Sequence, residues 1–214
     1  MKTSFDFLVF RRFFVFMKSF APPDALRAAR ALLRLSQQEL SKKIQVTRQS
    51  ISAAESDASA PLPTVSKMRR FYEDQGLQFL GVIDIDTGSI NAAGVRWRPP
   101  DTFPPALTEA SKYHAELHGT MFVAARCLLG ASRVAVADHS AISLKDLAAL
   151  EAGTRSGEAY HRLRSYYVQA GIEFMGTGEV RTGLYYGVGV RWANSEREFF
   201  DDGISDKGLS VGRA

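Results

Sequence analysis

The sequence predicts a mainly α-helical protein with small β-hairpins, arranged as two tandem helical bundles that are each followed by one hairpin. Amphipathic stretches alternate with loops that contain Pro, Gly and Ser, and each series ends in two strand-like stretches around a turn. The whole pattern occurs twice, with an offset of 96 or 95 residues. A chain of 214 residues, 45% of them hydrophobic, is long enough for two small packed units.

Composition divides the chain into five segments. The first is aromatic and holds seven of the fourteen phenylalanines, the last is polar, and a linker that opens with prolines separates two helical units. The segments are 1–20, 21–100, 101–119, 120–193 and 194–214. We predict a helix over residues 108–118 of the linker, and we expect much of the tail to be flexible.

The aromatic extension leaves three alternatives open. Arg11 and Arg12 interrupt its apolar runs, so it is not a convincing membrane span or signal peptide. It is an upstream extension with the working start near Met17, a strand or arm that packs on the core, or a dimer contact that covers its phenylalanines.

The elements of the first unit follow from caps, breaks and apolar periodicity. Asp24 is expected to cap the first helix, and Gly76 to end the last one. Apart from residues 36–55, the predicted elements are helices over 25–35 and 65–75 and strands over 77–85 and 94–98.

Residues 36–55, SQQELSKKIQVTRQSISAAE, predict two short helices joined by a tight turn. Ser36 followed by Glu39 has the spacing of a capping box, which predicts a first helix over 37–44. The turn falls at Gln45-Val46, and Thr47 caps the second helix. The pair is pinned against a core by Leu40, Ile44, Val46 and Ile51.

The exposed residues of the second helix suit the recognition of DNA. Arg can donate two hydrogen bonds to guanine, Gln can form two hydrogen bonds with adenine, and Ser or Thr can contact a base edge or a phosphate. These residue types are supplied here by Arg48, Gln49, Ser50 and Ser52.

This stretch resembles the helix-turn-helix of the XRE family, the Cro and phage-repressor type of bacterial regulators. The matching residues are Ser36, Gln37, Leu40, Val46, Ile51, Ser52 and Glu55, with Thr47 in the place where the family usually has Ser. Ser41 replaces the usual Ala, and Gln45 replaces the usual turn Gly, which costs strain in a left-handed conformation. The resemblance implies a lambda-repressor-like bundle that regulates transcription by binding DNA.

The resemblance also implies roles for individual residues. Gln37 would bind a phosphate, Arg48, Gln49 and Ser52 would face base edges, and Thr47 and Ser50 would meet the backbone or the groove wall. The candidate DNA-binding residues of the first unit are therefore Gln37, Lys42, Lys43, Thr47, Arg48, Gln49, Ser50 and Ser52.

The second unit carries a degenerate version of the motif, and the shared register indicates a tandem duplication. Arg30 and Glu55 recur as Arg126 and Glu151, and the Gly-Val-Arg-Trp of residues 94–97 returns at residues 189–192. The base-reading residues do not recur, and two aspartates, Asp138 and Asp146, bring negative charge. The remaining candidates in this unit are Arg133, Ser143 and Lys145.

The charge distribution favours the first unit as the one that meets DNA. The net charge is +4, but residues 1–100 carry +6 and residues 101–214 carry −2. A basic half is compatible with a polyanionic partner. The single cysteine, Cys127, excludes an internal disulfide and a Cys-based zinc site, fits a reducing cytoplasm, and is expected to be a small buried side chain.

Patterns typical of enzymes are missing from the sequence. It has no Ser-His-Asp, Cys-His or phosphate-loop pattern, so we predict neither an enzymatic activity nor a cofactor. His114 and His118 lie four residues apart on the predicted linker helix, but no third ligand accompanies them, so we predict no metal site.

The sequence therefore predicts a sequence-specific regulator of transcription, most simply a repressor, that binds double-stranded DNA in the cytoplasm and not a membrane. Two arrangements stay open. In one, a single chain acts as a covalent pseudo-dimer on an asymmetric or direct-repeat site. In the other, two chains form a homodimer that places the first unit of each chain on a palindrome. The charge asymmetry favours the homodimer, with the two hairpins as candidate interfaces. The alternative function is a protein-interaction module, such as an anti-activator that sequesters a transcription factor, with the second unit as the partner surface.

Overall fold

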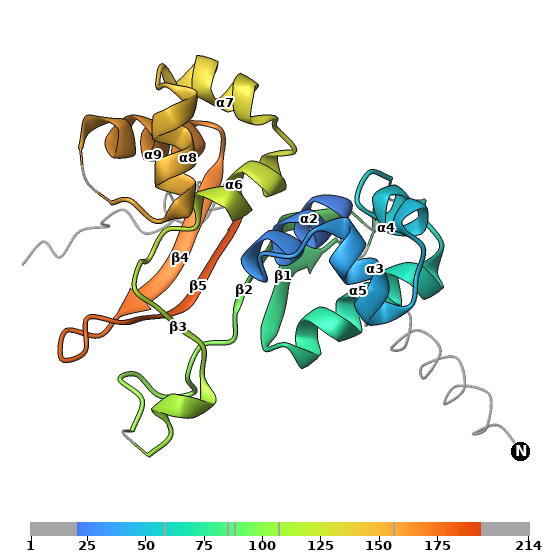
Figure 1. Cartoon of the computed structure of the whole chain (residues 1–214). Coiled ribbons are helices and arrows are strands. Elements are labelled where there is room, and N and C mark those ends of the chain that lie inside the picture. The colour runs from blue at the N-terminus through green and yellow to red at the C-terminus, as the bar shows by residue number, and fades with distance from the viewer. Residues whose placement is uncertain are drawn as a thin grey trace, which may run out of the picture.

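The computed structural model describes residues 21–193 except residues 58, 85, 88, 107 and 156. The predictions for the aromatic extension at residues 1–20 and for the tail at residues 194–214 lie outside the described residues. Within the described part, two helical units are joined by one β-sheet (Figure 1).

The first unit consists of four helices followed by a hairpin. Its elements are α2 (Pro23–Leu32), α3 (Gln37–Ile44), α4 (Arg48–Ala54), α5 (Leu62–Asp74), β1 (Leu77–Ile83) and β2 (Ile90–Trp97). The predicted bounds of α3 and the predicted start of α4 are confirmed, because Ser36 and Thr47 cap these helices as expected. Helix α5 begins three residues earlier than predicted, with a proline in its first turn. The N–H groups of a first turn have no partner within the helix, so the missing N–H of proline costs no hydrogen bond there.

The prediction that Asp24 caps the first helix is wrong. Helix α2 begins at Pro23, whose fixed φ suits the first helical position, with Pro22 as its N-cap. Asp24 instead accepts a hydrogen bond from the indole Nε1 of Trp192 at 2.6 Å. This carboxylate therefore ties the start of the first unit to the last strand of the second.

The second unit repeats the same order of elements. These are α6 (Phe122–Leu129), α7 (Arg133–Ser140), α8 (Leu144–Ala152), α9 (Glu158–Gln169), β4 (Ile172–Gly178) and β5 (Tyr185–Trp192). Ser132 and Ser143 cap α7 and α8 as Ser36 and Thr47 cap α3 and α4. The local signals that form the first bundle therefore also form the second.

The prediction of a helix over residues 108–118 of the linker is wrong. The linker forms one 3-10 turn, η1 (Ala110–Lys112), and a two-residue strand, β3 (Ala115–Glu116), that pairs with β5. The segment lacks an apolar stripe that could hold a helix on the core, and Leu117 is 71% exposed. His114 stacks on Trp97 with ring centroids 3.6 Å apart, which holds the extended chain against the sheet.

The two hairpins form one antiparallel sheet. Strand β2 pairs with β5 through Val95 opposite Val190, and this pair is flanked by Gly94 opposite Arg191 and by Arg96 opposite Gly189. Val95, Gly94 and Arg96 correspond to Val190, Gly189 and Arg191 at an offset of 95 residues, so the pairing is symmetric about the two valines. The edges that were candidate dimer interfaces cover each other within one chain.

Glycine is required at this crossing. A Cβ atom at Gly94 would lie far closer than 3.0 Å to the backbone of Val190 and Arg191, and one at Gly189 would meet the backbone of Val95 and Arg96 in the same way. Side chains at these two positions would push the strands apart, so the absence of a Cβ lets the two units join.

One apolar core runs through both units. Fully buried side chains of the first unit, including Leu26, Met68 and Tyr72, belong to the same cluster as Phe122, Leu163 and Tyr167 of the second. Helices α2 and α6 pack against each other at the centre. Arg27 of α2 also donates from Nε to the carbonyl oxygen of Cys127 on α6 at 2.9 Å.

Candidate nucleic-acid interface

Helices α3 and α4 are joined by the turn that the sequence predicts. Gln45 has φ 52° and ψ 49°, a left-handed conformation, and its backbone N–H donates to the carbonyl oxygen of Ser41. The N–H of Val46 donates to the same oxygen at 3.3 Å. A side chain in the left-handed region is strained, so the turn is held by the packing of Leu40 and Ile51, both fully buried, on either side of it.

The start of α4 is organised by its cap. The Thr47 hydroxyl accepts a hydrogen bond from the backbone N–H of Ser50 at 3.1 Å, and the two hydroxyl oxygens lie 2.8 Å apart. These hydroxyls satisfy each other and one helix N–H that would otherwise lack a partner. Both remain at the surface, with Thr47 exposed and Ser50 half-buried.

The remaining polar residues of α4 point outward without internal partners. Arg48, Gln49 and Ser52 are exposed, and none makes a side-chain hydrogen bond to any residue that the structure describes. Lys42 and Lys43 on α3 are exposed in the same way. A guanidinium, an amide and a hydroxyl are therefore free at one helix surface, with two ammonium groups on the preceding helix.

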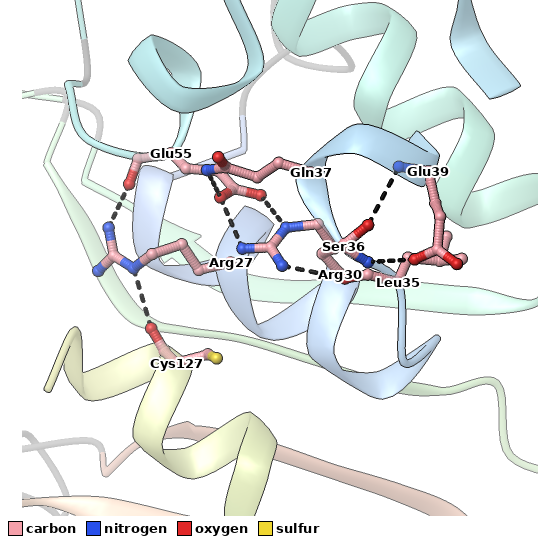
Figure 2. A network of polar contacts seen from close by, with 8 residues as sticks. All are labelled: Arg27, Arg30, Leu35, Ser36, Gln37, Glu39, Glu55 and Cys127. Carbon is pink, nitrogen blue, oxygen red and sulfur yellow. Dashed lines mark hydrogen bonds and ion pairs between the residues drawn. The ribbon is translucent and has the colours of Figure 1, made fainter. Parts of the chain in front are cut away.

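Gln37 is positioned by a buried carboxylate. Its Nε2 donates to Oε2 of Glu55 at 2.8 Å, and the Glu55 side chain is 2% exposed. Arg30 of α2 donates to the same carboxylate from Nε at 2.6 Å and from Nη2 at 2.8 Å (Figure 2). Arg27 donates to the backbone carbonyl oxygen of Glu55. One Nε2 hydrogen of Gln37 is thus used internally.

This network fixes the C-terminal end of α4 to α2 and α3. Burial lowers the pKa of Arg30, but the hydrogen bonds and the negative charge of Glu55 outweigh burial, so the pKa is raised overall. Sequence reasoning did not assign this role to Arg27, Arg30 and Glu55. The sequence held one indication of this network: Arg30 and Glu55 both recur at the same offset, as Arg126 and Glu151.

The same network exists in the second unit, where it engages one of the candidate residues. Arg126 and Arg133 both bind the carboxylate of Glu151, Arg133 through Nε at 2.8 Å. Arg133 stands at the position that Gln37 has in the first unit, and 59% of its side chain is exposed. Its guanidinium is therefore partly committed to a structural ion pair.

The surface of α8 differs from that of α4. The Ser143 hydroxyl caps the helix and donates to Oδ2 of Asp146 at 2.6 Å, while Lys145 is exposed without a partner among the described residues. Leu144 and Val134 are 51% and 57% exposed. This surface offers one ammonium group beside a carboxylate and apolar side chains.

The two linker histidines do not face one ion. His114 stacks on Trp97 and pairs with Glu116 at 2.8 Å, whereas His118 lies beside a cavity that Arg155 also lines. Burial and the charge of Arg155 lower the pKa of His118. No group of three or more His, Cys, Asp or Glu residues able to hold a metal ion occurs in the described part of the chain.

Cys127 is half-buried on α6 and packs against the shared core. Burial raises the pKa of its thiol, the opposite of what a reactive thiolate requires. The residue packs against the core, as a buried side chain was expected to, but it is only half-buried.

Comparison with known proteins supports the assignment of the first unit. Residues 26–73 match a helix-turn-helix family model of the XRE type, a range that spans α2 to α5 and supports a DNA-binding regulator of transcription. No curated protein and no solved structure matches the chain. None of the helices between residues 21 and 193 has the length and apolar character needed to cross a membrane.

Proposed function

We propose that this protein regulates transcription by sequence-specific binding of double-stranded DNA, with α4 of the first unit in the major groove. The proposal starts from the helix-turn-helix match over residues 26–73. It rests chiefly on Arg48, Gln49 and Ser52, which are exposed on α4 and make no hydrogen bonds within the described chain. A carboxylate or amide partner inside the protein would occupy these groups, and no described residue does so.

Positioning and phosphate binding fall to the surrounding residues in this proposal. Lys42 and Lys43 meet phosphates, Thr47 and Ser50 hold the helix start against the groove wall, and Gln37 uses its second Nε2 hydrogen and its backbone N–H for a phosphate. In the second unit, Lys145 is the one candidate of the three whose polar group makes no internal bond among the described residues. Arg133 and Ser143 supply at most backbone contacts.

The repeated order of elements and the symmetric β2–β5 pairing support an origin by tandem duplication, with one chain forming a covalent pseudo-dimer. Because α4 and α8 differ in surface chemistry, we propose that a chain reads a single half-site. In a homodimer on a palindrome each chain would read one half-site in this way, and the dimer would need an interface other than the paired β2 and β5 edges. Repression is favoured by the resemblance to phage repressors, and location at the nucleoid in the cytoplasm follows from DNA binding.

Selection from a random DNA library tests the proposal. We expect the full chain to enrich one sequence motif that occupies a single major-groove face, about 3–5 base pairs in length as for one recognition helix. Arg48→Ala should abolish the enrichment without lowering the thermal midpoint, while Arg70→Ala, at an exposed arginine of α5, should not. Enrichment of a palindrome with two equal arms would favour the homodimer, and no enrichment would contradict sequence-specific binding.

A further inference from the structure

A polar cavity of about 410 Å³ lies where the two units and the linker meet. It is bordered by the end of α2, the linker around β3, and helices α6 and α8. Its charged and polar lining consists of Arg34, Glu116, His118, Thr120, Glu151 and Arg155. No residue of α3 or α4 lines this cavity, so an occupant and DNA on α4 would use different residues.

Two arginines of the cavity form no ion pair with an acid in the described part of the chain. Arg155 donates to the Thr120 hydroxyl, while its Nε is buried and has no hydrogen-bond partner among the residues that the structure describes. Arg34 makes no side-chain hydrogen bond in the part of the chain that the structure describes. Burial is the main cause that lowers the pKa of Arg155, and the charge of Arg34 adds to it slightly, while interactions with Tyr160 and Glu116 oppose it. The carboxylate of Glu116 therefore lies near both arginines, which in turn help to lower its pKa.

The acids of the cavity are engaged elsewhere. Glu151 is bound by Arg126 and Arg133, and Glu116 is held by the ring Nε2 of His114 at 2.8 Å. Among the described residues, neither acid forms a hydrogen bond or an ion pair with Arg34 or Arg155. A buried guanidinium N–H without an acceptor is costly, and an oxyanion with several acceptor atoms would satisfy it together with both charges.

The backbone at Arg34 supplies an independent observation. Arg34 has φ 55°, a left-handed conformation that L side chains rarely adopt, whereas the same turn of the second unit holds Gly130 with φ 71°. Glycine adopts this conformation without steric cost, and strained residues persist where their side chain has a task. The first unit keeps a guanidinium at the one position of this turn where glycine would fit better.

We propose that this cavity binds a small organic anion through its carboxylate or phosphate group, held by Arg34 and Arg155. Because Arg34 belongs to the first unit and Arg155 to the second, the bound anion bridges the units. The cavity volume falls in the range of small-molecule sites, about 300–1,000 Å³. The proposal does not depend on DNA binding by α4.

Isothermal titration calorimetry of the full chain tests the site, with inorganic phosphate and succinate as separate probes in a buffer free of other oxyanions. We expect one site per chain for at least one probe, and the stronger probe identifies the preferred group. Arg155→Gln and Arg34→Gly should each weaken binding at least tenfold. Arg164→Gln, at an exposed arginine of α9 outside the cavity, should leave binding unchanged.

Arg34→Gly keeps the test independent of folding, because it relieves backbone strain and should not lower the thermal midpoint. Absence of saturable binding for both probes would overturn the proposal, as would equal binding by the wild type and both cavity variants. Displacement of the probe by short duplex DNA would also overturn it, since the cavity would then hold a backbone phosphate and not a small ligand.

Discussion

At the scale of single residues, the orientation of α4 depends on one buried carboxylate. Glu55 directly follows α4 and receives hydrogen bonds from Arg30 on α2 and Gln37 on α3. The contacts come from two different helices, so they fix the end of α4 in direction as well as position. A base-reading helix needs this fixation, because its side chains must reach base edges in a defined register.

Replacement of Glu55 by Gln should destabilise the protein and disorder α4. Gln leaves the partly buried Arg30 without its counter-charge, and breaking such a buried pair costs about 3 kcal/mol. Urea unfolding measures this loss as a change in the free energy of unfolding. The matched control is Glu158→Gln, which removes the same charge from an exposed pair with Arg162 and should cost no more than about 0.5 kcal/mol. Equal effects of the two substitutions would show that Glu55 does not anchor α4.

At the scale of elements, α4 and α8 have the same place in their units but different surfaces. Arg48 and Gln49 correspond to Leu144 and Lys145, and Ser50 corresponds to Asp146. The caps and the buried networks occur in both units, so both bundles have the fold of a helix-turn-helix, while the exposed side chains of α8 differ from those of α4. The packing of these helices is therefore compatible with different surface chemistry.

The joining of the hairpins depends on two glycines, and Gly94→Ala should break it. A Cβ at Gly94 meets the backbone of Val190 and Arg191, which cannot rotate away, so the cost should reach about 3 kcal/mol as for severe overpacking. We expect urea unfolding to change from one transition to two, as the units lose their shared sheet.

The control for this substitution is Gly178→Ala. Its Cβ would press on the ring of Tyr185, an exposed side chain that can move, and Gly178 has no positive φ. A single unchanged transition in Gly94→Ala would contradict the joining role of the β2–β5 contact.

At the scale of the whole molecule, sequence patterns predicted local structure better than the contacts between units. Ser36, Glu39 and Thr47 determined the bounds of α3 and α4, because capping is a property of neighbouring residues. The pairing of β2 with β5 was not predicted as an internal contact, since an open strand edge does not reveal whether it meets its own chain or a second copy.

The linker and the candidate site show the same limit of prediction from sequence, because contacts between distant residues decide both. Residues 115–116 form a strand because β5 offers a free edge there, and a helical spacing of two histidines cannot reveal that edge. The candidate residues on α4 were chosen from residue type and spacing, and the structure adds that Arg48, Gln49 and Ser52 are exposed. The role of Glu55 was not assigned from the sequence, because the carboxylate is paired by an arginine 25 positions away.

The central claim is direct readout of DNA by α4. The most direct test measures how tightly the wild type and Gln49→Ala bind the selected DNA site across a series of salt concentrations. Lys145→Ala changes the equivalent position of α8 and serves as the matched control. We expect Gln49→Ala to weaken specific binding by about 1–3 kcal/mol with an unchanged salt slope, because a base contact releases no counterion. Lys145 can contact a phosphate but no base edge in this account, so Lys145→Ala should leave the preference for the selected site over random DNA unchanged. Full affinity and specificity in Gln49→Ala, or no preference of the wild type for the selected site over random DNA at any salt concentration, would contradict direct readout by α4.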